Sequence, residues 1–110
     1  MIQILGVKNC NDTKKAIRFF KDRKIDIQFI NLKEKGISKG ELKSIVRIFD
    51  IEDLLDREGK EFKKRNLEYY VFDTLELLME SPTLFKTPIL REKNKVTIGY
   101  KPEIWKEWIK

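Results

Sequence analysis

The chain has 110 residues, of which 41% are hydrophobic, and this size and composition suit one globular domain with an ordinary core. It carries 24 Lys and Arg against 18 Asp and Glu, a formal net charge of +6, but acidic residues lie between the basic ones along most of the sequence. This pattern is typical of a solvated Lys-rich surface, and no nucleic-acid reader motif appears. We therefore expect no direct nucleic-acid binding.

Cysteine and histidine usage excludes several further classes. Cys10 is the single cysteine and there is no histidine, so the chain has no internal disulfide, no His-assisted nucleophile and no zinc or iron–sulfur ligand spacing. No apolar run approaches the roughly 18 residues of a transmembrane helix, and the N-terminus lacks a basic-then-apolar signal pattern. We expect a cytoplasmic monomer with no membrane association and no bound metal or cofactor.

The first third of the chain predicts a strand, a helix and a second strand. Residues 1–5 are a short apolar run, and from Asn11 onward apolar side chains recur at helical spacing. Residues 27–32 then alternate between apolar and polar, which is typical of a strand. Together these elements predict a right-handed βαβ unit.

Cys10 falls at the corner between the first strand and the first helix. Free backbone N–H groups and the positive end of a helix dipole both favour a thiolate there, and can lower a cysteine pKa from about 8.5 to between roughly 3.5 and 7.5. The alternative is a small buried hydrophobe, a common role for a lone cysteine. Because Cys10 interrupts the apolar pattern within the polar sequence Lys-Asn-Cys-Asn-Asp, we favour a reactive thiol.

The middle of the chain predicts helices and no strands. Ser38 and Glu41 fit a capping box, Asp73 and Glu76 repeat the same spacing, and Pro82 follows the last helical position. We therefore predict a helical insert at about residues 37–81 within a single domain of residues 1–110. The helical spacing assigns these side chains to the core: Leu42, Ile45, Val46, Phe49, Leu75, Leu78 and Met79.

The C-terminal part returns to strand character and ends in a helix. Residues 88–91 and 96–100 are strand-like and flank a polar turn, which predicts a β-hairpin. Pro102 and Glu103 mark a helix start, and the apolar face that follows comprises Ile104, Trp105, Trp108 and Ile109. At this spacing we expect the tryptophan pair to pack in the core rather than to form a binding surface.

The predicted order is β-α-β, a helical insertion, then β-β-α, with a cysteine at the start of the first helix. This layout resembles the α/β thioredoxin-like fold, and specific residues resemble the ArsC/Spx family of arsenate-reductase-like proteins over nearly the whole chain. The order and spacing of these residues, rather than any single motif, carry the resemblance. They are Gly6-Val7-Lys8-Asn9-Cys10, Leu54-Leu55 followed by Gly59 and Phe62, and Pro82 to Pro88 followed by Ile98-Gly99-Tyr100.

The chain is most similar to the YffB-like branch of this family, which is associated with glutathione-dependent thiol reduction. Residues 6–10 nearly reproduce the Gly-x-Lys-Asn-Cys start of that branch, and residues 14–16 continue the similarity. The resemblance implies a thiol-dependent oxidoreductase in which Cys10 forms a mixed disulfide with an external thiol. Glutathione or another low-molecular-weight thiol would be the co-substrate, or a glutaredoxin-like protein the reductant.

Two other activities in the family remain open. Spx-type regulators bind the RNA polymerase α-subunit and sense oxidation through a Cys-x-x-Cys pair. Thr13 replaces the second cysteine here, which excludes the disulfide switch but not polymerase binding. The family's arsenate reductases use an arginine triad, whose positions correspond here to Asp56, Thr87, and Tyr100 or Lys101. An arsenate dianion needs fixed positive charge, so arsenate reduction ranks third, with Arg57 or Lys101 as substitute cations.

Several residues are candidates to support the thiolate or bind substrate. Thr13 lies one helical turn from Cys10 and can donate its hydroxyl to the thiolate, although it can equally face solvent. Asp12 adds negative charge beside the sulfur, or else pairs with free N–H groups at the helix start. The resemblance implies a cis Pro88 that presents Thr87 to the thiol partner, whereas base rates favour trans. The full candidate set is Lys8, Cys10, Asn11, Thr13, Lys14, Arg57, Thr87 and Pro88.

Overall fold

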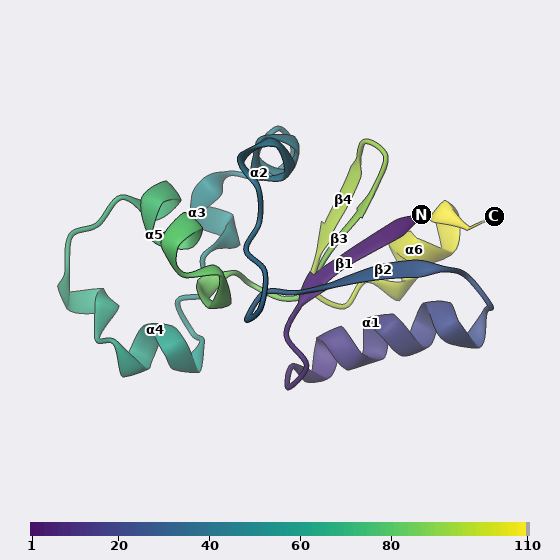
Figure 1. Ribbon diagram of the computed structural model, residues 1–110, viewed down its shortest axis with the longest axis horizontal. Helices are drawn as coiled ribbons and strands as arrows, with labels where there is room; N and C mark the ends of the chain where they lie inside the picture. The colour runs from purple at the N-terminus through teal and green to yellow at the C-terminus, as the bar shows by residue number, and fades with distance from the viewer. Residues whose placement is uncertain (110) are drawn as a thin grey trace. The chain divides into compact units, whose positions relative to one another are not determined.

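The computed structural model describes residues 1–109 and divides them into two compact units (Figure 1). The first unit joins residues 1–31 to residues 87–109, and the second is Leu32–Lys86. Cys10, Thr13, Thr87 and Pro88 all belong to the first unit, so that unit holds the core of the candidate site.

A mixed sheet forms the centre of the first unit. Its spatial order is β2-β1-β3-β4; β1 pairs in parallel with β2 and antiparallel with β3, and β3 pairs antiparallel with β4. Helix α1 connects β1 to β2, and helix α6 follows β4, which confirms the predicted β-α-β and β-β-α order. The bounds are β1 (Ile2–Gly6), α1 (Asn11–Asp22), β2 (Ile27–Asn31), β3 (Ile89–Glu92), β4 (Lys95–Ile98) and α6 (Pro102–Trp108).

The core of this unit lies between the sheet and the apolar faces of α1 and α6. Alternate positions of a strand share a face, so β1 contributes two isoleucines, and α1 adds side chains at helical spacing. The Trp105 indole N–H donates to the Thr97 hydroxyl at 2.8 Å, which satisfies its polar atom inside the core. Core packing is thus confirmed for Trp105. The cluster comprises Ile2, Ile4, Ala16, Phe19, Phe20, Leu90 and Trp105.

The end of α1 is fixed by its own backbone. Lys24 adopts a left-handed conformation with φ 58°. The N–H of Ile25 donates to the Phe20 carbonyl at 2.9 Å, and the N–H of Lys24 donates to the Lys21 carbonyl at 3.0 Å. This pair of bonds is a Schellman motif, which satisfies carbonyls at a helix end. It stops α1 before β2 and so sets the length of the crossover.

The second unit is made of short helices around a small apolar core. The Ser38 hydroxyl accepts from the Glu41 N–H while the Glu41 carboxylate accepts from the Ser38 N–H, which confirms the capping box, and the Asp73 carboxylate accepts from the Glu76 N–H. The helices expected at about residues 37–81 all lie here. They are α2 (Lys39–Val46), α3 (Ile51–Leu54), α4 (Lys60–Lys64), the 3₁₀ helix η1 (Leu67–Tyr69) and α5 (Thr74–Glu80); a second 3₁₀ helix, η2 (Pro82–Leu84), follows the expected range.

Three side chains that the helical spacing assigns to a core are exposed. Val46, Leu75 and Ile104 retain 39%, 49% and 45% of their accessible surface. Their helices have only seven or eight residues. In each helix the residue immediately before or after the exposed side chain is the buried one: Ile45, Thr74 and Trp105. A neighbouring residue in a helix is turned by about 100°, so the side chain beside a narrow stripe faces solvent.

Candidate functional site

Cys10 is the N-cap of α1. Its backbone is extended, with φ −87° and ψ 121°, and its carbonyl accepts the first bond of the helix from the Lys14 N–H at 3.1 Å. Its own N–H donates to the Val7 carbonyl at 3.2 Å, which closes the turn after β1. The Cys10 side chain is half-buried. The sulfur therefore sits beside the first-turn N–H groups while keeping access to solvent.

Thr87, which lies 77 positions along the chain from Cys10, contacts the Cys10 sulfur. Its hydroxyl donates to Cys10 Sγ at 3.2 Å, and the protonated thiol can donate to the Thr87 carbonyl at 3.9 Å. The peptide bond between Thr87 and Pro88 is cis, as the family resemblance implies. Pro88 is buried, and the N–H of Gly99 donates to its carbonyl at 2.8 Å. The segment that carries Thr87 is thus anchored next to β4.

Thr13 lies under the corner, buried against Gly6. Its exposed fraction is 0%, so the solvent-facing alternative is wrong. Apart from the Cys10 thiolate, its hydroxyl has no hydrogen-bond partner among residues 1–109. A Cβ atom placed on Gly6 would lie 2.5 Å from Thr13 Oγ1 and 2.7 Å from Thr13 Cγ2. Only glycine at position 6 leaves room for this threonine.

These contacts set the ionisation of the thiol. Burial raises the pKa of Cys10, but hydrogen bonds from the Thr13 and Thr87 hydroxyls and from the backbone N–H groups of Thr13 and Asp12 lower it. The hydrogen bonds outweigh the burial, and the pKa of Cys10 lies below its ordinary value. Asp12 contributes to this balance through its backbone N–H. The site therefore favours a thiolate, the form that acts as a nucleophile.

The other candidates make none of these contacts. The side chains of Lys8, Asn11 and Lys14 are exposed at the corner and the first turn of α1, and none of them is a cause of the lowered pKa. Arg57 belongs to the second unit, where its guanidinium pairs with the Glu52 carboxylate at 3.1 Å. We therefore build the site on Cys10 and its hydroxyl and backbone donors.

Gly6 is a residue of the candidate site that the sequence did not single out. It appears in the resemblance motif only as the first letter of Gly-x-Lys-Asn-Cys, and its role depends on a side chain seven positions later. A glycine at the end of a buried strand, immediately before a cysteine corner, is the signal that could have identified it.

The described residues offer no alternative centre for chemistry based on metals. Among residues 1–109, no group of three or more Cys, Asp or Glu side chains is placed to hold a metal ion. Within the same range, no helix is both long enough and apolar enough to cross a membrane.

Two comparisons of the sequence with known proteins point to the same family. The sequence model of the ArsC family matches residues 5–108. The global transcriptional regulator Spx 2 of Oceanobacillus iheyensis is 31% identical over 104 residues, covering 90% of this chain and 76% of that protein.

Solved structures confirm the thioredoxin-like fold. A YffB protein superposes with a TM-score of 0.83 at 24% identity, with 97% of each chain covered. A glutaredoxin from Archaeoglobus fulgidus superposes with a TM-score of 0.51 at 16% identity, covering 99% of this chain and 85% of that one. The family match spans both units and the cysteine corner. The chain belongs to the ArsC family.

Proposed function

We propose that this protein is a thiol-dependent oxidoreductase that uses Cys10 as its single nucleophile and glutathione, or another low-molecular-weight thiol, as co-substrate. The observation that carries the proposal is the 3.2 Å hydrogen bond from the Thr87 hydroxyl to Cys10 Sγ, at a sulfur whose pKa is lowered. A hydroxyl aimed at the sulfur stabilises the negative charge of the thiolate. Nothing in ordinary core packing requires that contact.

The chemistry proceeds by two thiol–disulfide exchanges. In the first, the Cys10 thiolate attacks the glutathione sulfur of a glutathione mixed disulfide on a substrate; a new S–S bond forms, the old one breaks, and the substrate leaves as a thiolate. In the second, a free glutathione thiolate attacks the glutathione sulfur bound to Cys10. This step releases oxidised glutathione and regenerates the Cys10 thiolate. Overall, the substrate sulfur is reduced to a thiolate and the sulfur of one free glutathione is oxidised; the other half of the released oxidised glutathione comes from the substrate disulfide.

The groups at the sulfur fit a disulfide better than an arsenate ion. They are two hydroxyls and backbone N–H groups, all neutral donors. A dianionic oxyanion needs concentrated positive charge, which the family's arsenate reductases supply with arginines. Thr87 occupies one of the positions that correspond to those arginines and contacts the sulfur directly. Arsenate is therefore the less suitable substrate.

Reaction with oxidised glutathione tests the proposal. We expect the folded protein at pH 6.5 to gain one glutathione per chain, by intact mass, several-fold faster than the same chain unfolded in urea. The folded thiol is more ionised at that pH, although its intrinsic nucleophilicity is lower. Added reduced glutathione should remove the adduct. An adduct that forms no faster on the folded chain, or that reduced glutathione does not release, would contradict the proposal.

A regulatory role is the second candidate. The similarity to Spx 2 favours it, because that protein is a transcriptional regulator and the match covers 90% of this chain. The partner would then be the RNA polymerase α-subunit, and binding would not depend on a disulfide because Thr13 replaces the second cysteine. The Cys10→Ser variant separates the roles, since it removes thiol chemistry and leaves a protein–protein surface intact.

A further inference from the structure

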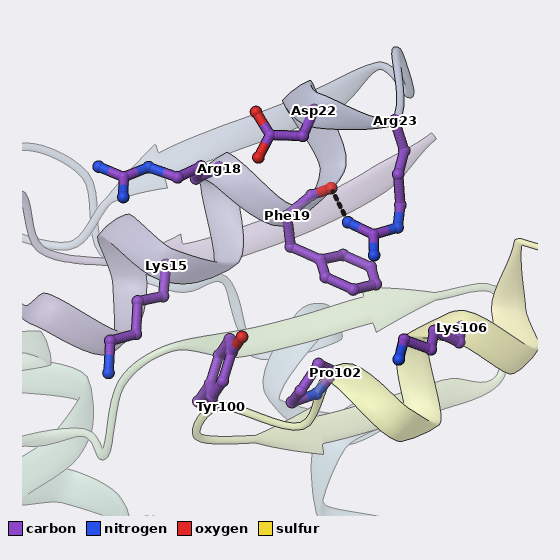
Figure 2. A pocket seen from close by; sticks show the side chains of 8 residues that line it. All are labelled: Lys15, Arg18, Phe19, Asp22, Arg23, Tyr100, Pro102 and Lys106. Atoms are coloured by element: carbon purple, nitrogen blue, oxygen red, sulfur yellow. Dashed lines mark hydrogen bonds between the residues drawn. The ribbon is translucent and has the colours of Figure 1, made fainter.

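A second surface of the first unit carries charge that the thiol chemistry does not use. A groove of about 430 Å³ runs between α1 and the segment that begins α6 (Figure 2). Cys10 is not among the residues that line it. The lining includes four cationic side chains, Lys15, Arg18, Arg23 and Lys106, and one carboxylate, Asp22.

Two of these cations are held in place by aromatic rings. The guanidinium of Arg23 lies 3.8 Å from the centre of the Phe19 ring and donates to the Phe19 carbonyl at 3.0 Å (Figure 2). The ammonium of Lys15, on α1, lies 5.5 Å from the centre of the ring of Tyr100, which precedes α6 and also lines the groove. Side chains fixed in this way lose less conformational entropy when they bind a ligand.

Within the part of the chain that the structure describes, carboxylates do not neutralise the cations of the groove. Among residues 1–109, none of the four forms an ion pair with a carboxylate, and Asp22 is the single acidic residue in the lining. The groove thus concentrates a net positive charge in a concave surface, where field lines are focused. A ligand with several negative charges is the complement of such a surface.

The span of the groove and the state of its rings decide the class of ligand. Lys15 and Arg23 mark the two ends of the α1 side of the groove, and the seven positions from Lys15 to Asp22 already cover about 10 Å along the helix, so a ligand longer than a small anion matches the spread of the cations. Base stacking needs an open ring face, but the Arg23 guanidinium lies over the Phe19 ring and the Lys15 ammonium lies over the Tyr100 ring, which also makes an edge-to-face contact with Trp105. These contacts disfavour a nucleobase.

We propose that this groove binds an acidic peptide segment of a partner protein, whose carboxylates pair with the cations of α1 and α6. An extended peptide advances about 3.3 Å per residue, so roughly three to four residues span the groove. The lysines supply point charges and the arginines supply planar donors that match carboxylates. This surface is distinct from the Cys10 site and does not depend on the proposed function.

Two matched variants test the proposal with fluorescein-labelled hexaglutamate as the probe. Lys15→Gln with Lys106→Gln removes two groove charges, whereas Lys14→Gln with Lys21→Gln removes two charges from the neighbouring hollow of α1. Each pair has one lysine in the last turn of a helix and all four side chains are exposed, so effects on folding are matched. By fluorescence anisotropy in 50 mM salt, we expect the groove pair to weaken binding about tenfold and the control pair less than twofold.

Three results would overturn the proposal. The first is the absence of saturable binding of hexaglutamate to the wild-type protein. The second is equal weakening by the two variant pairs, which would mean that net charge alone attracts the probe. The third is tighter binding of a single-stranded hexanucleotide than of hexaglutamate, with the same loss in the groove variant, which would assign the groove to nucleic acid.

Discussion

Replacing Cys10 with serine should reduce exchange with a glutathionylated peptide to the rate of free glutathione, a loss of at least about a hundredfold. A serine hydroxyl is not ionised near neutral pH and cannot form a mixed disulfide, so neither exchange step can occur. The half-buried position of Cys10 accommodates serine, and the change adds no atoms to the corner. We expect little change in the free energy of unfolding.

The assay contains reduced glutathione in excess. Chromatography monitors the release of the free peptide thiol over time. Circular dichroism and urea unfolding of the variant serve as the control for folding. A Cys10→Ser protein that keeps more than a small part of the wild-type rate would show that the reaction does not pass through this thiol. If the Cys10→Ser variant does not fold, the Cys10→Ala variant takes its place in the assay.

Replacing Gly6 with alanine should both destabilise the protein and weaken the thiolate site. The new Cβ would lie 2.5 Å from Oγ1 and 2.7 Å from Cγ2 of Thr13, whose side chain is fully buried, so one of the two residues must shift. Overpacking of this kind costs ~1–3 kcal/mol of unfolding free energy. Displacing the Thr13 hydroxyl also removes a hydrogen bond that lowers the pKa of Cys10, so that pKa should rise.

A double variant separates these two effects. Gly6→Ala with Thr13→Ala removes both close contacts and should recover part of the stability, measured by urea unfolding. It cannot restore the hydroxyl, so the pKa of Cys10 should stay raised. If Gly6→Ala alone is as stable as the wild type and keeps its low thiol pKa, the packing of Thr13 under the corner is not what positions the site.

Much of the architecture follows from local patterns in the chain. The apolar run of β1, the helical spacing after Asn11 and the hairpin signals near the C-terminus each correspond to an observed element. The capping box at Ser38 is a local signal of the same kind. Short helices were less predictable, because a stripe only one or two residues wide is decided by tertiary neighbours, as Val46 and Leu75 show.

The candidate site was predictable only in part. Cys10 and Thr13 share one corner, so helix geometry alone places them together. Thr87 lies 77 positions from Cys10, and no local pattern brings the two together; the family resemblance supplied that pairing. The close approach of Gly6 to Thr13 depends on how closely the end of β1 packs against α1. No pattern of residues in a single sequence predicts that distance.

The pH dependence of Cys10 alkylation by iodoacetamide tests the central claim most directly. The Thr87 hydroxyl stabilises the charged form of the thiol, so the rate in the wild-type protein should have its midpoint below about 8.5 and fall as pH drops through that midpoint. Thr87→Val keeps the shape and removes the donor, so its midpoint should be higher, whereas Thr87→Ser keeps the donor and should match the wild type. A wild-type midpoint at or above about 8.5, or one that Thr87→Val leaves in place, would contradict the account.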